Sequence, residues 1–447
     1  MTDRPEPTRA EGAPDPTGAE SAESAESAQA SETDETDETT EPMTAGGTQA
    51  PGEAASAPRR RRASGWLIAG RTLVALVSAA VLVATGLVTV RLDEFQDSVT
   101  TTDAVADAQE APDAPPVDDG GTDILLVGSD TRTDLQGRPL SAKVLRELRT
   151  EATETINTDT LILLRLSRAG GPGYAISIPR DAYVPVPGHG AEKINGAFGV
   201  TKSRVARELR ARGETDNAKV EVESDNAARS ALVQTVQGLT GVRVDHYAEI
   251  TLYGFYLLTE AIDGVDVCLN RSTSDPDSGA DFRRGPQTVR GGDAVSFVRQ
   301  RKNLPRGDLD RIVRQQTFLS SAMNKVLSSG GLTDPARLSA LEQAVSQTVV
   351  MDPSLHFLDL VEQAQALATG QLQFVTIPVT AVGVRNDKDQ SIVAVDIPTV
   401  QRYVSALVST NPPPRPPAPP TVSDNLGGRK LLDLGAPAAP AQVPCVD

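Results

Sequence analysis

Short apolar runs alternate with amphipathic stretches between about residues 122 and 410. Runs rich in Val, Ile and Leu predict strands at Ile124–Val127, Leu161–Leu166, Tyr174–Ile178, Tyr247–Thr251, Val265–Leu269, Val295–Val298 and Phe374–Ile377. Helical periodicity predicts helices at Ala142–Ala152, Lys202–Arg212, Ala227–Leu239, Phe255–Ile262, Leu309–Ser328 and Pro335–Val349. Strands interleaved with helices predict an α/β fold, in which an α-β-α sandwich surrounds a mixed central sheet.

The pattern is absent from the first 57 residues, which are acidic and of low complexity. They contain 14 Asp and Glu residues against 2 Arg, so this segment carries −12 of the net charge of −17. Such a composition cannot offset the entropy of ordering, and we expect a disordered cytoplasmic tail. Thr33, Thr36, Thr39 and Thr40 lie among its acids and are candidate regulatory phosphorylation sites, although a plain solubilising tail is the alternative.

A basic segment, residues 58–71, precedes 19 uncharged residues from Thr72 to Val90. As a helix this run is about 28 Å long, which matches the ~30 Å hydrocarbon core of a membrane. Five Arg residues flank it on the N-terminal side and one, Arg91, on the other, so the remainder of the chain is expected to be extracellular. A cleaved signal peptide and a buried soluble helix are the alternatives, but no A-x-A cleavage site follows the run.

The chain beyond the predicted membrane helix divides into three parts by composition. Residues 91–121 are polar and predict an extracellular stalk, residues 122–410 predict the globular domain, and residues 411–447 predict a Pro-rich C-terminal tail. Aromatic residues make up only 3% of the chain, so the core must consist of aliphatic side chains. Three widely separated His and two Cys argue against a zinc site and a Cys-rich scaffold.

Cys268 and Cys445 both fall on the predicted extracellular side of the membrane. Oxidising conditions there favour a disulfide between them, and the Pro-rich spacer is long enough to let the tail fold back. An inert, buried Cys268 with a free or intermolecular Cys445 is the alternative.

Two carboxylates mark the ends of the first two predicted strands. Asp130 follows the first strand and Asp159 begins the next, so an antiparallel pairing would bring them to one edge of the sheet. Two carboxylates without His or Cys suit Mg²⁺, with Mn²⁺ possible. Two ordinary loop aspartates are the alternative.

Basic residues gather at three later positions. Arg180 follows the third strand, Lys193 lies in the next loop, and the densest group spans Arg299 to Gln315. Within it, Arg299 and Arg301 are predicted to share one strand face, and Arg311, Arg314 and Gln315 one helix face beside Asp308 and Asp310. Repelling guanidinium groups suit phosphate or pyrophosphate. Structural Arg–Asp pairs are the alternative, and the lack of interleaved aromatic residues disfavours nucleic acid.

Five segments in order resemble the LytR-CpsA-Psr family of cell-wall glycopolymer ligases. These segments are DILLVGSDTR, NTDTLILL, SIPRDAYVPVPGHGAEKINGAFG, LTGVRVDHYAEI and FVRQRKNLPRGDLDRIVRQQ, and the resemblance runs from Ile124 to Gln316. The resemblance implies an Mg²⁺-dependent phosphotransferase on the outer face of a Gram-positive, and by composition actinobacterial, cell membrane. It would join a glycopolymer from a polyprenyl-pyrophosphate carrier to peptidoglycan or a related wall glycan, with a hydrophobic groove for the polyprenyl chain.

The resemblance also assigns roles to individual residues. It implies metal ligands at Asp130 and Asp159, with Asp308 near the reacting centre. It implies pyrophosphate contacts at Arg132, Arg180, Lys193, Arg299, Arg301, Arg311, Arg314 and Gln315. A non-catalytic glycolipid-binding scaffold and a membrane-linked transcriptional regulator are the alternative functions.

Three departures from the family pattern concern the acceptor and regulation rather than the phosphate site. Ala261–Gly264 replaces a Gly-Gly pair, a charged insertion spans Val200 to Ala227, and no accessory domain follows the spacer.

Overall fold

A seven-stranded mixed sheet forms the centre of the protein, in strand order β1-β12-β7-β2-β3-β4-β13. The computed structural model describes residues 78, 98–117, 120–151, 156–167, 172–328, 335–355, 372–409 and 443–447. The strands of this sheet are β1 (Thr100–Thr101), β2 (Gly121–Ser129), β3 (Thr158–Ser167), β4 (Gly173–Ser177), β7 (His246–Thr251), β12 (Val349–Met351) and β13 (Leu372–Thr376). β2 pairs antiparallel with β3 and parallel with β7, which confirms the predicted mixed sheet.

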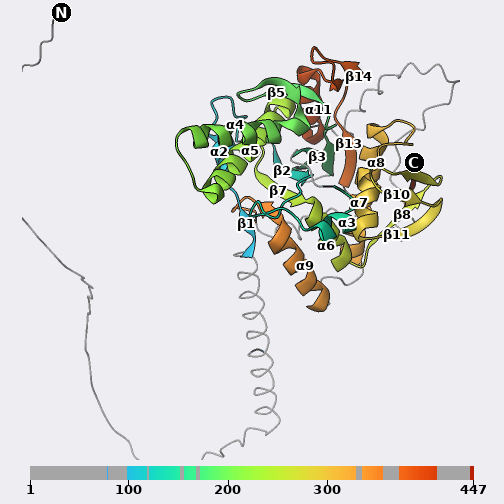
Figure 1. Ribbon diagram of the computed structural model, residues 1–447. Coiled ribbons are helices and arrows are strands. Elements are labelled where there is room, and N and C mark those ends of the chain that lie inside the picture. The colour runs from blue at the N-terminus through green and yellow to red at the C-terminus, as the bar shows by residue number, and fades with distance from the viewer. Residues whose placement is uncertain are drawn as a thin grey trace, which may run out of the picture. The chain divides into compact units, whose positions relative to one another are not determined.

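Helices cover both faces of this sheet. The helices are α2 (Ala104–Gln109), α3 (Ala142–Glu147), α4 (Ala197–Ala211), α5 (Asn217–Thr240), α6 (Leu252–Ala261), α7 (Gly291–Arg299), α8 (Asp308–Ser328), α9 (Pro335–Thr348) and α11 (Ile397–Ser409), with a short 3₁₀ turn at Ile194–Gly196. Leu125 and Val127 of β2 pack on one face against α5 and α11, whereas Ile124 packs on the other face with residues of α8 and α9. Figure 1 shows α4 and α5 on one side, α7 and α8 on the other, and the sheet between them.

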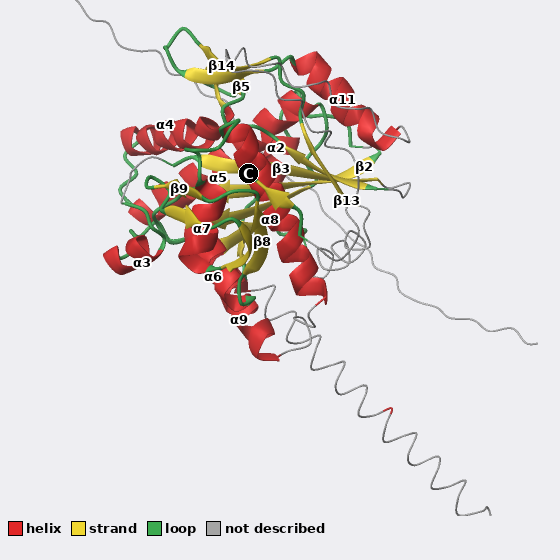
Figure 2. Ribbon diagram, turned by 90° about the vertical axis from the view of Figure 1, so that its right-hand side faces the viewer, coloured by secondary structure: helices red, strands yellow, loops and turns green. Residues whose placement is uncertain are grey.

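Four smaller pairings lie around the central sheet (Figure 2). They comprise the hairpins β5 (Tyr183–Val186) with β6 (Gly190–Lys193), β9 (Thr273–Asp275) with β10 (Ala280–Phe282), β14 (Ala381–Arg385) with β15 (Ser391–Ala394), and the sheet of β8 (Val265–Leu269), β11 (Gly285–Val289) and β16 (Cys445–Val446). β16 was not expected, because residues near the C-terminus carry no strand pattern. It exists through parallel pairing with β8.

The predicted strand Val295–Val298 is wrong, because these residues form part of helix α7. Gly291 to Asp293 supply a first turn with an acidic side chain, and Ala294, Val295 and Phe297 are buried on the helix. A four-residue run with three apolar side chains, Val295, Phe297 and Val298, fits either period, so packing decides the outcome. Arg299 and Arg301 therefore do not share a strand face: Arg299 ends the helix and Arg301 lies in the following loop.

Two segments hold more structure than their sequence indicated. Residues 98–117, expected to belong to the stalk, contain β1 and α2, and Val105 and Ala108 reach the core. The charged insertion is helical: α4 extends to Ala211, and α5 begins at Asn217 after an Asp216 cap that accepts from two backbone N–H groups. Conversely, α3 ends at Glu147, five residues before the predicted end.

Several predictions concern residues outside the described ranges. These are the acidic tail with its candidate Thr sites, the basic segment, most of the Thr72–Val90 run, the start of the stalk and the Pro-rich spacer. Among the helices that the structure does describe, none has the length and apolar character needed to cross a bilayer.

Candidate functional site: an arginine cluster at the sheet edge

The pairing of β2 with β3 brings the two predicted carboxylates to one edge of the sheet. Ser129 pairs with Thr158 after an irregularity at Gly128, and the Asp130 N–H donates to the Asn157 carbonyl at 2.8 Å. Asp130 and Asp159 therefore lie at adjoining strand ends. We define the arginine cluster as the charged residues around this edge: Asp130, Arg132, Asp159, Arg180, Arg299, Arg301, Asp308 and Arg311.

Arg132 neutralises Asp130. Its guanidinium bonds the Asp130 carboxylate, and Nη1 also donates to the Asp130 carbonyl at 2.6 Å. Nε donates to Thr150 Oγ1 at 3.1 Å and to the Glu151 carbonyl at 3.2 Å. The loop after β2 thus folds around one buried guanidinium group.

Arg180 links the other two carboxylates of the cluster. It follows β4 and Pro179, where the strand ladder stops. Nη1 donates to both carboxylate oxygens of Asp159 at 2.9 Å, and Nε donates to Asp308 Oδ2 at 2.9 Å. Burial opposes the ionisation of Asp159, but the charges of Arg180 and Arg311 outweigh it and lower the pKa of this carboxyl.

Asp308 is the carboxylate on which three arginines converge. It opens α8, where Arg311 Nη2 lies 3.2 Å from Oδ2, and Arg301 Nε approaches Oδ1 at 3.4 Å. Burial again opposes ionisation, but the positive charges of Arg311, Arg180 and Arg301 hold the pKa of Asp308 below its ordinary value. Asp308 is therefore ionised at neutral pH.

The positive charges of the cluster exceed its negative charges. Five guanidinium groups surround three carboxylates, and Lys193 adds nothing net because its Nζ pairs with Asp181 at 3.0 Å. In the described part of the protein, Arg299 Nη1 and Arg311 Nε are buried without a hydrogen-bond partner. Burial, followed by repulsion from Arg180, lowers the pKa of Arg311 to about 10. Burial also lowers the pKa of Arg299. The arrangement can accept an anion with several oxygens.

Two predicted site residues, Gln315 and Arg314, form their hydrogen bonds outside the arginine cluster. Gln315 donates to the Val298 carbonyl at 3.2 Å and thereby joins α8 to α7. Arg314 is fully buried (0% exposed) and points away from the cluster toward β16: Nε donates to the Asp447 carbonyl at 2.6 Å and Nη1 to Gln300 Oε1 at 2.6 Å. Its guanidinium also lies 5.0 Å from the Phe297 ring centre. The structure thus ties Arg314 to the C-terminal segment instead of to the other arginines.

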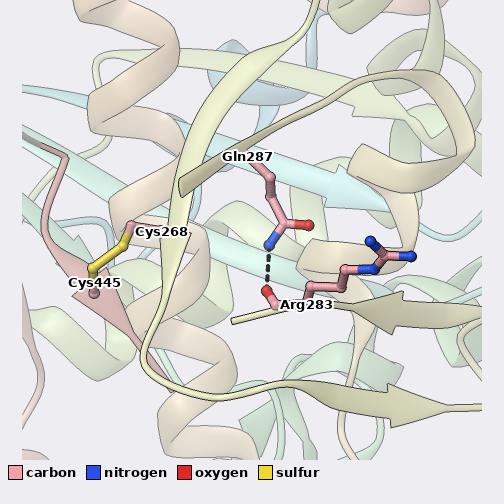
Figure 3. The surroundings of a disulfide bond; sticks show 4 residues. All are labelled: Cys268, Arg283, Gln287 and Cys445. Atoms are coloured by element: carbon pink, nitrogen blue, oxygen red, sulfur yellow. Dashed lines mark hydrogen bonds between the residues drawn. A yellow bond between two sulfur atoms is a disulfide. The ribbon is translucent and has the colours of Figure 1, made fainter. Parts of the chain in front are cut away.

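The segment near β16 contains the predicted cysteine pair. Cys268 and Cys445 form a disulfide that closes a separation of 177 residues, with Cα atoms 4.3 Å apart (Figure 3). The Asn270 N–H donates to the Val446 carbonyl at 2.8 Å, and the Val446 side chain is buried. On the neighbouring strand Gln287 donates to the Arg283 carbonyl at 2.7 Å, as Figure 3 shows.

Sequence reasoning missed three polar residues that support the cluster. Asp181 pairs with Lys193, and the Asn195 side chain bonds Asp159. Both sit inside the quoted family segments, so the motif itself was the available signal. Asp275 bonds the loop that carries Arg301, and no local pattern in the sequence indicates this.

The fold and the cluster define a mixed α/β protein with an arginine-rich, anion-accepting site at a sheet edge. Residues 88–406 match the LytR_cpsA_psr family. The chain belongs to this family.

Similar sequences agree with this membership. The chain is 45% identical over 316 residues to the cell wall biosynthesis protein LcpA of Corynebacterium glutamicum, a match that covers 71% of this chain and 60% of LcpA. It is 30% identical over 212 residues to the polyisoprenyl-teichoic acid–peptidoglycan teichoic acid transferase TagU of Oceanobacillus iheyensis, covering 47% of this chain and 53% of TagU. The solved structure of Bacillus subtilis TagV is 18% identical with a TM-score of 0.45, covering 66% of this chain and 97% of TagV.

Proposed function

We propose that this protein is a phosphotransferase that joins a glycopolymer from a polyprenyl-pyrophosphate carrier to peptidoglycan or a related wall glycan. The carrying observation is the unbalanced cluster, in which buried nitrogens of Arg299 and Arg311 lack partners beside two strand-end carboxylates. A pyrophosphate would supply the missing acceptors and negative charge. The similarity to TagU, a polyisoprenyl-teichoic acid–peptidoglycan teichoic acid transferase, supports this choice of substrate class.

An incompletely covered apolar surface supports a polyprenyl carrier. Between α8 and the sheet face against which it packs, several apolar side chains are only partly buried. They are Leu126, Ala248, Ile250, Leu319, Met323, Leu372 and Phe374. α8 begins with Asp308 and Arg311 and continues with Leu319 and Met323 against this face. One helix therefore connects the charged cluster with an apolar surface on which a polyprenyl chain would lie.

The reaction requires positioning and charge neutralisation more than covalent chemistry by the protein. An acceptor hydroxyl oxygen bonds to the sugar-linked phosphorus, the bridging P–O bond breaks, and polyprenyl phosphate leaves. Arg180, Arg299 and Arg311 stabilise the charge that builds on the departing phosphate. The hydroxyl proton passes to a carboxylate, for which Asp308 is the candidate. When Arg180 and Arg311 turn to the phosphates, the pKa of Asp308 rises and the carboxylate becomes a better base.

Mg²⁺, with Mn²⁺ as a substitute, is the proposed metal, and Asp130 and Asp159 are its proposed ligands. The charges of Asp130 and Asp159 both act on Arg299, so the two carboxylates lie near the same guanidinium group. Within the described ranges no three His, Cys, Asp or Glu side chains converge as a metal site. Mg²⁺ needs only one or two protein carboxylates when substrate phosphates and water complete its shell. Bound there, it would neutralise developing phosphate charge.

The Thr72–Val90 run is the proposed membrane anchor. Its 19 uncharged residues and the five Arg residues on its N-terminal side support an orientation with the catalytic domain outside the cell. This placement would bring the cluster to the wall side of the membrane, where the proposed acceptor lies.

A ligation assay tests the proposal. Purified protein is incubated with a defined polyprenyl-pyrophosphate glycan and a wall-glycan acceptor, and released polyprenyl phosphate and phosphodiester product are quantified. We expect turnover with Mg²⁺ that stops in excess chelator and returns when Mg²⁺ is restored. Donor binding without turnover under any metal condition would replace the enzyme with a glycolipid-binding scaffold.

A further inference from the structure

The loop that carries Arg301 has an irregular backbone held from the side by a hairpin. α7 ends at Arg299, and Gln300 turns the chain out of the helix with φ −55° and ψ 134°. The Arg301 side chain is 58% exposed, and among the described residues its one carboxylate partner is Asp308, with Nε 3.4 Å from Oδ1. The direction of Arg301 therefore depends on how its backbone is fixed.

Asp275, at the end of β9, fixes this backbone. It is 1% exposed, and Oδ2 accepts from the N–H groups of Arg301 at 3.0 Å and Lys302 at 3.1 Å. Oδ1 accepts from the Asp277 N–H at 3.1 Å. Burial opposes ionisation of Asp275, but the hydrogen bonds from the Arg301 and Lys302 backbone outweigh it and lower its pKa. An ionised carboxylate thus caps two consecutive N–H groups that no helix or strand would satisfy.

A second tether reaches the same loop through Gln300. Its fully buried side chain donates to Thr273 Oγ1 at 2.5 Å and to the Lys302 carbonyl at 3.0 Å. Its Oε1 accepts from Arg314 Nη1 at 2.6 Å. Both tethers start from β9, so the β9–β10 hairpin determines where the loop from Gln300 to Lys302 lies.

We propose that Asp275 is a positioning residue for the phosphotransfer: its carboxylate fixes the Arg301 backbone so that the guanidinium faces the pyrophosphate beside Asp308. This inference rests on the proposed function and adds to it a residue that touches neither substrate nor metal. Its charge also faces Arg299, since Asp275 acts electrostatically on that guanidinium. If the carboxylate is lost, Arg301 can sample other directions, and the effect should be transmitted through Arg301.

A double-mutant cycle distinguishes positioning from a general structural role. The variants are Asp275→Ala, Arg301→Ala and the combination, assayed for phosphodiester formation and for inorganic pyrophosphate affinity by calorimetry. Asp277→Ala is the matched control, because Asp277 lies in the same hairpin, is exposed, and pairs with the Lys302 ammonium at 2.5 Å. Asp275→Asn retains one acceptor oxygen and completes the cycle if the Ala variant does not fold.

We expect Asp275→Ala to lower turnover roughly 10- to 100-fold, as for lost hydrogen bonds to a charged group. In the Arg301→Ala background the same change should cost less than about twofold. Asp277→Ala should match wild type, and Asp275→Asn should fall between wild type and Asp275→Ala.

Two results would overturn the inference while wild-type protein is active: near-wild-type turnover of the Asp275 variants, or equal losses with and without Arg301. If the wild-type protein shows no turnover, the proposed function itself is overturned, and this inference with it.

Discussion

Two groups of buried charges on the central sheet differ in how completely their atoms are partnered. The first is the arginine cluster at the ends of β2, β3 and β4. The second joins Arg229 of α5 to Glu249 and Tyr247 of β7. Arg229 Nε donates to Glu249 Oε2 at 2.8 Å, and the Tyr247 hydroxyl donates to the same oxygen at 3.0 Å.

The second group is balanced. Arg229 and Glu249 side chains are 11% and 3% exposed, and neither has a buried nitrogen or oxygen without a partner in the described structure. Burial opposes ionisation of Glu249, but Arg229 outweighs it and lowers the pKa of this carboxyl. In the arginine cluster, by contrast, arginines outnumber carboxylates and two buried nitrogens lack partners. Buried charge alone therefore does not indicate function, whereas a buried excess of one sign does.

The largest effect on stability should follow from removing the positive charge of the balanced group. Arg229→Met leaves Glu249 buried without its counter-charge, and breaking a buried pair from one side costs about 3–5 kcal/mol. Urea unfolding measures the loss in free energy of unfolding. Lys219→Ala is the control, because this lysine of the same helix is exposed and its pairing with Glu214 should not contribute measurably. A wild-type midpoint for Arg229→Met would contradict the assignment of this pair as structural.

Removing one arginine from the arginine cluster should lower activity without lowering stability. Arg299→Ala or Arg311→Ala should reduce turnover by about 10²–10³-fold, as for loss of one donor to a transition-state oxyanion. Stability should hold or rise, since repulsion between guanidinium groups is relieved. Arg290→Ala, at the exposed start of the same helix as Arg299, serves as the control for kinetics and thermal unfolding. Full activity in either cluster variant would remove the basis for the proposed anion site.

A smaller, pH-dependent effect distinguishes what the charge of Glu249 contributes to stability from what the packing of its side chain contributes. Because the folded pKa of Glu249 is lowered, its contribution to stability is complete above its unfolded pKa of about 4.3 and is lost as the pH falls through the folded value. Glu249→Gln should therefore be less stable than wild type by a constant amount at pH 5 to 7, and the difference should shrink as the pH falls below about 4.3. Parallel unfolding curves at pH 3 to 7 measure this, and a gap that does not shrink on acidification would point to packing instead of charge.

The sequence predicted the part of the arginine cluster at the ends of β2 and β3 better than the part that α7 and the following loop contribute. The predicted strands Ile124–Val127 and Leu161–Leu166 required only an antiparallel pairing to bring two carboxylates together, and that pairing is present. The helix Leu309–Ser328, which carries Arg311, was likewise predicted, because its 3.6-residue period is long and clear.

The rest depended on contacts between distant segments. Val295–Val298 was too short to distinguish a strand from a helix without its neighbours. Arg314 lies one turn after Arg311, yet it bonds the Asp447 carbonyl, 133 residues later. Asp275 reaches the Arg301 backbone across 26 residues. No periodicity or motif in a single sequence reports such pairings.

The central claim, that the arginine cluster is a pyrophosphate site, is tested most directly by ligand-dependent stability. Unfolding of wild-type protein and of Arg299→Ala is followed with increasing inorganic pyrophosphate in the presence of Mg²⁺. At a pyrophosphate concentration 100 times the Kd, binding to the folded state should stabilise wild-type protein by about 2.7 kcal/mol. Arg299→Ala should respond much less, and Arg290→Ala as wild type. A wild-type unfolding midpoint that does not change with pyrophosphate would contradict the account.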